Sequence, residues 1–219
     1  MRVHQRRHRM HANPFAVRHE IEVPDWGSVY GRSAPFALDI GFGPGMFVLE
    51  LARQHSTWNV LGVEIRQHLV DMVLEGAAAE GLRNVHAVLA NANLHVERLL
   101  PEGSVAFVSV NFPDPWFKHR HHKRRVLTAA WLPVLLGKMQ PEAELHFMSD
   151  YEPLARYTLT LLDREARLVN LDGPGNFATE STTGITSERE QTHLRRAEPV
   201  YRLRYRLRPP TLVEMMPGC

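Results

Sequence analysis

Short apolar runs alternate along this chain with longer stretches in which apolar residues recur every three or four positions. Apolar runs of four to eight residues are typical of buried strands, whereas the wider spacing is typical of one buried helix face. The runs predict strands at residues 36–40, 59–64, 85–90, 105–110, 144–149 and 166–171. The wider spacing predicts helices at residues 46–54, 66–80, 126–138 and 151–163, and one that ends near residue 100. Pro133 removes a backbone donor and is expected to kink the helix at 126–138.

The last regular segment alternates strictly between apolar and basic residues. Tyr201, Leu203, Tyr205 and Leu207 occupy one set of positions, and arginines occupy the positions between them. This period of two predicts a strand that buries its apolar face and turns the arginines to the other face. Repeated strand–helix units predict an α/β fold with a doubly wound parallel sheet, which binds ligands outside the carboxyl ends of its strands.

The chain has 219 residues, which is long enough for one domain. We place this domain at residues 36–208, after a basic arm and lead-in at residues 1–35 and before a tail at residues 209–219. A Gly-, Thr- and Ser-rich loop at residues 172–186 is long enough to be functional. The one cysteine, Cys219, and the lack of a long apolar run or signal-peptide core predict a cytoplasmic protein with no membrane span and no metal site.

The net charge is only +2, but the basic residues are strongly segregated. Residues 1–19 and 116–125 each hold five Lys or Arg without an acid, and residues 195–208 hold six Arg against one Glu. These stretches contain 16 of the 26 basic residues. Such segregation favours a polyanionic partner such as nucleic acid. An anionic membrane is disfavoured, because the basic runs lack an apolar face.

Residues 112–125 have an order that a packed core does not require. Two prolines enclose Asp114, Trp116 follows, and residues 118–125 are eight consecutive Lys, Arg or His. The prolines stop the preceding strand and fix a rigid turn. A fixed acid, a stacking ring and dense cations at a strand end predict a polyanion held beside a reaction centre. The alternative interpretation is a solvated basic loop.

A glycine turn follows the first strand at Gly41, Gly43 and Gly45, and Glu64 ends the second strand. Glycines let a backbone approach a nucleotide, and an acid at this distance can accept hydrogen bonds from both ribose hydroxyls. The spacing is not the G-x-G-x-x-G of dinucleotide sites, and Asp39 would repel a diphosphate but attract an ammonium group. The pattern therefore favours S-adenosylmethionine over NAD, with a purely structural turn as the other alternative. No GK[ST] sequence supports a P-loop.

Polar residues stand at the carboxyl ends of five predicted strands. They are Asp39, Glu64, Asn91, Asp114 and Asp150. Because these strand ends meet at one edge of a parallel sheet, we expect the site at this edge.

Together these motifs resemble the bacterial tRNA (guanine-N7)-methyltransferase family. The matching motifs are Asp39-x-Gly41-x-Gly43-x-Gly45, Glu64, Asn91-Ala92-Asn93, the FPDPW sequence with its basic run, and a late Thr/Ser-x-x-Glu. The FPDPW-basic block is specific to the family, whereas class I methyltransferases share the glycine turn. The resemblance implies a Rossmann-like fold with seven strands and helices on both faces. It also implies S-adenosylmethionine as methyl donor and the guanosine at position 46, in the tRNA variable loop, as acceptor.

The resemblance also implies roles for individual residues. The donor site would hold Asp39, Gly41, Gly43, Gly45, Glu64, Asn91 and Asp114. Contacts with the guanosine or its tRNA would come from Lys118, Asp150, Thr186, Ser187 and Glu190. The register of the late motif is open, because spacing from Pro199 favours Ser187 and Glu190 whereas residue identity favours Thr186.

Some residues depart from the family's usual pattern. Asn91 and Asn93 replace acids, although an amide oxygen can still accept from an adenine amino group. Phe117 and His119 stand where proline or lysine is common.

Methylation at guanine N7 requires no proton removal, so the expected task of the site is orientation and charge stabilisation. Asp114 is the candidate catalytic residue, and Trp116 either stacks on a splayed base or packs under the loop. Phosphates would be bound by Arg120, Lys123, Arg124 and Arg125. His121 and His122 are not expected to bind a metal, because adjacent histidines face different ways.

Two other functions stay open at this point. One is a methyltransferase acting on another RNA, on a protein or on a small molecule, although the charge segregation disfavours the last two. The other is a non-catalytic RNA-binding protein on the same scaffold, which the presence of Asp39, Glu64 and Asp114 disfavours. The protein is expected to be a monomer or a homodimer.

Overall fold

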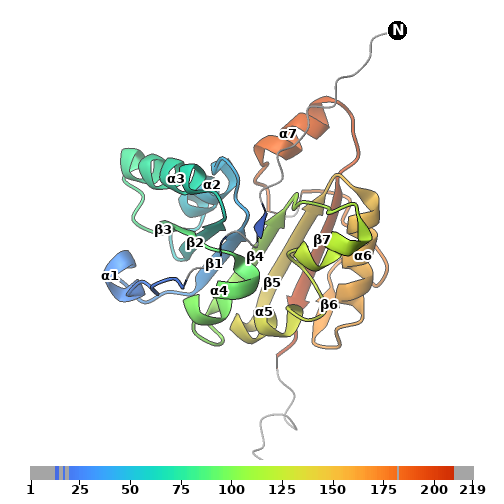
Figure 1. Ribbon diagram of the computed structural model, residues 1–219, viewed down its shortest axis with the longest axis horizontal. Coiled ribbons are helices and arrows are strands. Elements are labelled where there is room, and N and C mark those ends of the chain that lie inside the picture. The colour runs from blue at the N-terminus through green and yellow to red at the C-terminus, as the bar shows by residue number, and fades with distance from the viewer. Residues whose placement is uncertain (1–12, 15–16, 18–19, 182, 210–219) are drawn as a thin grey trace, which may run out of the picture.

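The computed structural model describes residues 13–14, 17, 20–181 and 183–209, and its centre is a seven-stranded sheet (Figure 1). The strand order is β3-β2-β1-β4-β5-β7-β6. The strands are β1 Phe36–Ile40, β2 Asn59–Glu64, β3 Val85–Leu89, β4 Val105–Asn111, β5 Met139–Ser149, β6 Leu168–Asn170 and β7 Tyr201–Leu207. Strands β1 to β5 pair in parallel, and β7 runs antiparallel between β5 and β6. The predicted α/β fold with a mostly parallel sheet is therefore confirmed.

The helices precede or connect these strands. They are α1 Trp26–Tyr30, α2 Met46–Gln54, α3 Gln67–Glu80, α4 Ala92–Leu99, α5 Leu132–Lys138, α6 Glu152–Asp163 and α7 Glu188–Arg195, with a 3₁₀ helix, η2, at His119–Arg124. None of the helices in the described ranges is long and apolar enough to cross a membrane. The apolar pattern did not predict α1, η2 or α7, because these segments are short or almost entirely polar.

The predicted helix at 126–138 is wrong in its first half. Helix α5 begins at Leu132 with Pro133 in its first turn, where the missing backbone donor costs nothing and the fixed φ suits a helix. The proline therefore starts the helix rather than kinking it. Strand β5 begins at Met139, directly after the helix and earlier than predicted. A left-handed residue, Glu142 with φ 65°, interrupts its early part.

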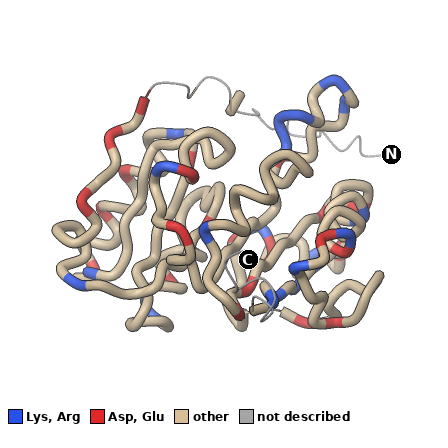
Figure 2. Tube along the Cα trace, turned by 90° about the horizontal axis from the view of Figure 1, so that it is seen from below, with Lys and Arg blue, Asp and Glu red and all other residues tan. Residues whose placement is uncertain are grey.

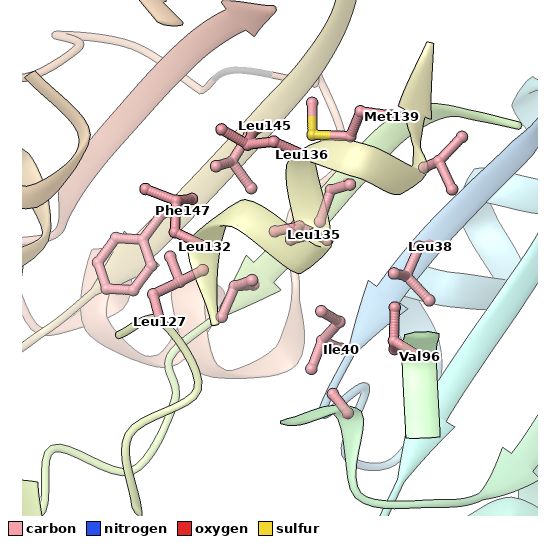
Figure 3. Close-up of a cluster of buried hydrophobic side chains, with 14 of the residues drawn as sticks. Leu38, Ile40, Val96, Leu127, Leu132, Leu135, Leu136, Met139, Leu145 and Phe147 are labelled. Atoms are coloured by element: carbon pink, nitrogen blue, oxygen red, sulfur yellow. The ribbon is translucent and has the colours of Figure 1, made fainter. Parts of the chain in front are cut away.

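Two apolar clusters lie on opposite faces of the sheet, because neighbouring β1 residues such as Ala37 and Leu38 belong to different clusters. One cluster packs α4, α5 and α6 against the sheet, and the other packs α2 and α3 (Figure 1). Figure 3 shows part of the first cluster, with labelled side chains Leu38, Ile40, Val96, Leu127, Leu132, Leu135, Leu136, Met139, Leu145 and Phe147. This packing holds the carboxyl ends of the central strands in place.

The apolar alternation of β7 is confirmed, since Leu203 and Tyr205 are fully buried. Its arginines, however, do not form an open basic face. Arg202 is buried against Glu190, whereas Arg204 and Arg206 form ion pairs with Asp172 and Glu144 (2.7 and 2.8 Å). The sequence pattern gave the correct strand but the wrong surroundings for its charges.

Candidate active site

The carboxyl ends of β1, β2 and β4 open into a cavity of about 470 Å³. The sequence-predicted residues that line it are Asp39, Gly41, Gly43, Glu64, Asn91, Asp114, Trp116, Arg124 and Ser187. They come from segments far apart in the sequence, so the predicted edge of the sheet does bring them together.

Asp39 lies near the end of β1 and is almost completely buried. Its Oδ1 accepts a hydrogen bond from the Ser109 hydroxyl on β4 at 2.7 Å. Burial raises the pKa of Asp39 to about 7, the Ser109 hydrogen bond lowers it, and the nearby carboxylates of Glu64 and Glu188 raise it further. A cationic ligand would relieve this crowding of carboxylates, whereas a diphosphate would worsen it.

The three glycines of the turn have two different uses. Gly41 and Gly43 line the cavity with φ of 74° and 60°, and nothing lies within 4 Å of where a Cβ would stand. A ligand can therefore approach this backbone closely. Gly45 does not line the cavity, and a Cβ there would lie 2.3 Å from Val73 Cγ2. Its role is to let the start of α2 pack against α3.

Glu64 ends β2 with a buried carboxylate that several donors hold in place. The backbone N–H groups of Ile65 and Gly43 donate to it at 2.8 and 3.3 Å. The Arg66 guanidinium donates to both oxygens, at 3.1 and 2.9 Å, which raises the pKa of Arg66. The carboxylate therefore has a fixed orientation at the cavity wall.

Asn91 and Asn93 stabilise the structure with their amide groups. Asn91 caps α4, because its Oδ1 accepts from the Asn93 backbone N–H at 3.1 Å. Its Nδ2 donates to the Pro14 carbonyl at 2.8 Å, and Asn93 Nδ2 donates to the Val126 carbonyl at 2.8 Å. A carboxylate could not make either donation, so the amides tie the lead-in and the segment before α5 to the cavity.

The turn that carries Asp114 lies between two residues in the left-handed region, Phe112 with φ 50° and Trp116 with φ 48°. Such conformations are uncommon outside glycine and cluster at functional sites. The Phe112 N–H donates to the Met148 carbonyl at 2.8 Å, which ties the turn to β5. Asp114 and Trp116 both line the cavity, and the Arg124 guanidinium lies 5.1 Å from the centre of the Trp116 ring.

Residues 118–125, the cationic run, wind through η2, and their side chains are not equivalent. Figure 2 marks Lys and Arg along the chain in blue and Asp and Glu in red. Lys118, Arg120 and Lys123 are exposed, and none of them forms an ion pair within the part of the chain that the structure describes. Arg125 is buried instead. It donates to the Pro115 carbonyl at 3.2 Å and its guanidinium lies 4.7 Å from the Tyr157 ring centre. Burial also lowers the pKa of Arg125, so its surroundings fit support of the turn rather than the predicted phosphate contact.

Helix α7 closes one side of the cavity with Ser187, Glu188, Arg189 and Thr192. The Ser187 hydroxyl caps the helix by accepting from the Glu190 N–H at 3.2 Å. Arg189 pairs with Asp150 after β5 and lies over the Phe112 ring, 5.5 Å from its centre. The helix is thus fastened to the Asp114 turn and to the end of β5.

Comparison with known proteins agrees with this geometry. Residues 33–203 match the family described as "Putative methyltransferase". A tRNA (guanine-N(7)-)-methyltransferase of Synechocystis sp. is 37% identical over 203 residues, covering 89% of this chain and 94% of the relative. One from Halorhodospira halophila is 36% identical, with coverages of 87% and 85%. This chain belongs to the tRNA (guanine-N7)-methyltransferase family.

Solved structures share the fold at lower identity. The 16S rRNA methyltransferase KamB superposes with a TM-score of 0.62 at 17% identity, over 88% of this chain and 97% of that one. The aminoglycoside resistance methyltransferase NpmB1 gives 0.58 at 20% identity, over 85% and 95%. At these identities the likeness supports the fold alone.

Within this methyltransferase, four predicted substrate residues do not line the cavity, namely Lys118, Asp150, Thr186 and Glu190. Asp150 is held by Arg189, and Glu190 is fully buried with Arg202. The sequence did not single out Glu188, Arg189, Phe112 or Asn111 as site residues, although the first two lie in the late motif and Phe112 opens the FPDPW motif, and all four line the cavity. The S-x-x-E sequence at Ser187 is a helix-start signal that could have revealed α7 and its cavity-facing residues. Among the described residues, no cluster of three or more His, Cys, Asp or Glu could hold a metal ion.

Proposed function

We propose that this protein transfers a methyl group from S-adenosylmethionine to N7 of the guanosine at position 46, in the variable loop of tRNA, in the cytoplasm. The observation that carries the proposal is the acid-lined cavity that also holds Asp114 and Trp116, directly beside the cationic run. The cavity thus favours a cationic ligand, and the cationic run beside it favours a polyanion. The names of the family relatives support the same reaction.

The cavity suits a cationic nucleoside donor. S-adenosylmethionine carries a sulfonium and an ammonium group, and it supplies the methyl group as an electrophile. Asp39, with Glu64 and Glu188 close by, would attract these positive charges. Gly41 and Gly43 leave their side of the cavity open, and the fixed Glu64 carboxylate can accept from ribose hydroxyls.

The acceptor atom sets a simple task for the protein. Guanine N7 has an exposed lone pair, so no residue has to remove a proton, and orientation of the ring is the main requirement. Asp114 can accept from the guanine N1–H and amino group, and its charge favours a ring that becomes positive. Trp116 lines the same cavity and offers a face for the base. Arg120, Lys123 and Arg124 would hold the flanking phosphates.

The reaction can be tested with purified full-length protein, labelled S-adenosylmethionine and unmodified tRNA. After digestion to nucleosides we expect the label in 7-methylguanosine, and chain cleavage at that base should map it to position 46. Label in another nucleoside would replace the proposed acceptor, and label in ribosomal RNA offered in a parallel reaction, with none in tRNA, would replace the proposal with methylation of another RNA. Binding of tRNA without any methyl transfer would favour the non-catalytic alternative.

The variant Asp114→Asn tests the mechanism. The amide can accept only one of the two guanine hydrogen bonds, and it removes the charge that favours the cationic ring. Loss of one such contact costs about 10²–10³ in rate, so single-turnover methylation should slow at least about a hundredfold, while donor and tRNA still bind. Glu75→Gln, an exposed acid on α3, is the matched control. A rate within about threefold of the parent would remove Asp114 from the reaction.

A further inference from the structure

Two groups of aromatic side chains lie outside the cavity. Phe117, Tyr151 and Tyr157 form the first, beside the cationic run, and Phe177 with Tyr201 forms the second. Phe117 contacts Tyr151, Arg125 lies close to Tyr151 and Tyr157, and Phe177 packs on Tyr201. The two groups have different surroundings.

Phe117 is the most unusual member, because 62% of its surface is exposed. Its ring meets the Tyr151 ring edge-on, with ring centres 5.0 Å apart. Tyr151 is the N-cap residue of α6 and is itself half-buried, so Phe117 rests against a fixed element. Burying a ring of this size normally stabilises a fold, but here most of the ring remains in water. Its contribution to folding is therefore small, and most of the ring is accessible to a ligand.

The charges around Phe117 identify the class of ligand. The ring follows Trp116 of the cavity wall and precedes Lys118, and the exposed Arg120 lies two residues further on. Close to Tyr151, the Arg125 guanidinium adds a buried positive charge. The Phe177–Tyr201 pair differs, because the Arg156 guanidinium that lies 6.0 Å from the Phe177 ring centre is paired with Glu152. Lys118 and Arg120 form no ion pair within the described residues, so the surroundings of Phe117 suit an aromatic ligand that carries negative charge.

We propose that Phe117, supported by Tyr151, is a stacking platform for an unpaired tRNA base next to the guanosine in the cavity. This inference rests on the proposed function, since it assumes that tRNA is the polyanion. A nucleotide joins a flat base to a phosphate, which matches an exposed ring beside exposed cations. Trp116 faces the cavity and Phe117 lies outside it, so the two neighbouring rings would hold two different nucleotides. A single rigid segment would thereby fix the angle at which the RNA enters the site.

The platform predicts a specific pattern of tRNA affinity. Removing a stacked ring weakens nucleic-acid binding without removing a phosphate contact. Phe117→Ala should therefore bind unmodified tRNA at least about fivefold more weakly, with an unchanged slope of log affinity against log salt. Phe117→Trp should restore the affinity, and Phe117→Leu, which keeps apolar volume but no ring face, should not. Met72→Ala, which removes an exposed apolar side chain on α3, should match the parent.

Fluorescence gives a readout that does not depend on methylation. In Phe117→Trp, tRNA and a single-stranded oligonucleotide of the variable loop should each quench emission beyond the quenching of the parent, as a stacked indole requires. Calorimetric affinity for S-adenosylmethionine should be the same in all variants. Thermal unfolding would show whether each variant is folded, and Phe117→Leu would replace Phe117→Ala if the latter unfolds.

Several results would overturn the platform. Parental affinity in Phe117→Ala would do so, as would a recovery in Phe117→Leu equal to that in Phe117→Trp. A flattened salt slope would assign the effect to charge, and loss of a dimer in Phe117→Ala would show that a second copy covers the ring. If the parent makes no 7-methylguanosine, the proposed function fails, whereas the binding and quenching results still decide whether Phe117 stacks on RNA.

Discussion

Two stretches of this chain are rich in basic residues but differ in how the folded protein surrounds their charges. The arginines of β7 each face an acid from another element, Glu190, Asp172 or Glu144. The cationic run contains no acid, and its three exposed cations, Lys118, Arg120 and Lys123, form no ion pair within the described residues. The first stretch is neutralised by the fold itself. The second is left for a ligand, so a count of basic residues overstates the positive surface.

The same contrast separates two buried carboxylates. Glu190 is fully buried, and its Oε1 accepts from Arg202 Nε and Nη2 at 2.9 and 2.7 Å. Asp39 is also buried, but its partner is the neutral Ser109 hydroxyl, and further carboxylates lie near. Charge in the α7–β7 region is thus balanced within the protein, whereas the cavity has an imbalance that a cationic ligand would correct.

The largest expected effect comes from breaking the buried pair. Arg202→Leu leaves the Glu190 carboxylate buried without its counter-charge, which should lower the free energy of unfolding by about 3–5 kcal/mol. Denaturant titration would measure this loss. The double variant Arg202→Leu, Glu190→Leu should recover most of the stability, because it removes both charges. A single variant as stable as the parent would show that the pair does not balance β7.

The opposite case, Asp39, should make stability depend on pH. Burial raises the pKa of Asp39 to about 7 from 3.8, so between these values the folded protein holds a proton that the unfolded chain has lost. Stability should therefore fall as pH rises through this window and level off above pH 7. Relative to Asp39→Asn, the parent should lose up to about 4 kcal/mol between these limits. If the free energies of unfolding of the parent and of Asp39→Asn changed equally with pH across this range, the raised pKa of Asp39 would be contradicted.

The next effect concerns the cationic run. Changing Lys118, Arg120 and Lys123 together to Gln should make the plot of log tRNA affinity against log salt concentration less steep by about 2–3, at roughly 0.7–0.9 per phosphate contact. The free energy of unfolding should stay within about 0.5 kcal/mol of the parent, because these side chains are exposed. Arg83→Gln and Arg164→Gln, exposed cations away from the run, should leave the slope unchanged. An unaltered slope in the triple variant would make the run a solvated surface.

The strands and the edge that holds the site could be predicted because both depend on local pattern. Apolar runs located six of the strands, the apolar–basic alternation located β7, and strand-end acids located Asp39, Glu64 and Asp114. Helix α7 escaped because Leu194 is its one apolar side chain, so it has no apolar period to find. The helix forms through its cap at Ser187 and its long-range pairs, which a periodicity cannot reveal.

The surroundings of individual charges could not be predicted for a related reason. Arg125 and Arg120 belong to the same run in sequence, and only the position of Pro115 and Tyr157 makes one buried and the other exposed. Likewise, the pairing of Arg189 with Asp150 joins residues 39 positions apart. Such contacts depend on how finished elements pack, and a single sequence carries no local signal for them.

The smallest effect is expected where a β7 arginine is paired at the surface. Arg206 donates to Glu144 at 2.8 Å, but the arginine is 43% exposed, so the pair is screened by water. Arg206→Gln should therefore lower the free energy of unfolding by only about 0.2–1 kcal/mol, far less than Arg202→Leu on the same strand.

The pKa of Glu144 gives this pair a pH dependence. The hydrogen bond with His146 is the main reason that this pKa lies at about 2, so the pKa should stay below 4.5 in Arg206→Gln. A depressed carboxylate stabilises the fold above its unfolded pKa and loses this contribution as pH falls, so the small cost should vanish towards pH 2. Carboxyl titration by NMR would measure the pKa of Glu144, and acid unfolding would measure how the stability loss varies with pH. As a control, tRNA binding by Arg206→Gln should keep the parental salt slope. If Arg206→Gln lost as much unfolding free energy as Arg202→Leu, exposure would not explain the difference between these two arginines. A flatter salt slope of tRNA binding would show that Arg206 contacts tRNA as the cationic run is expected to do.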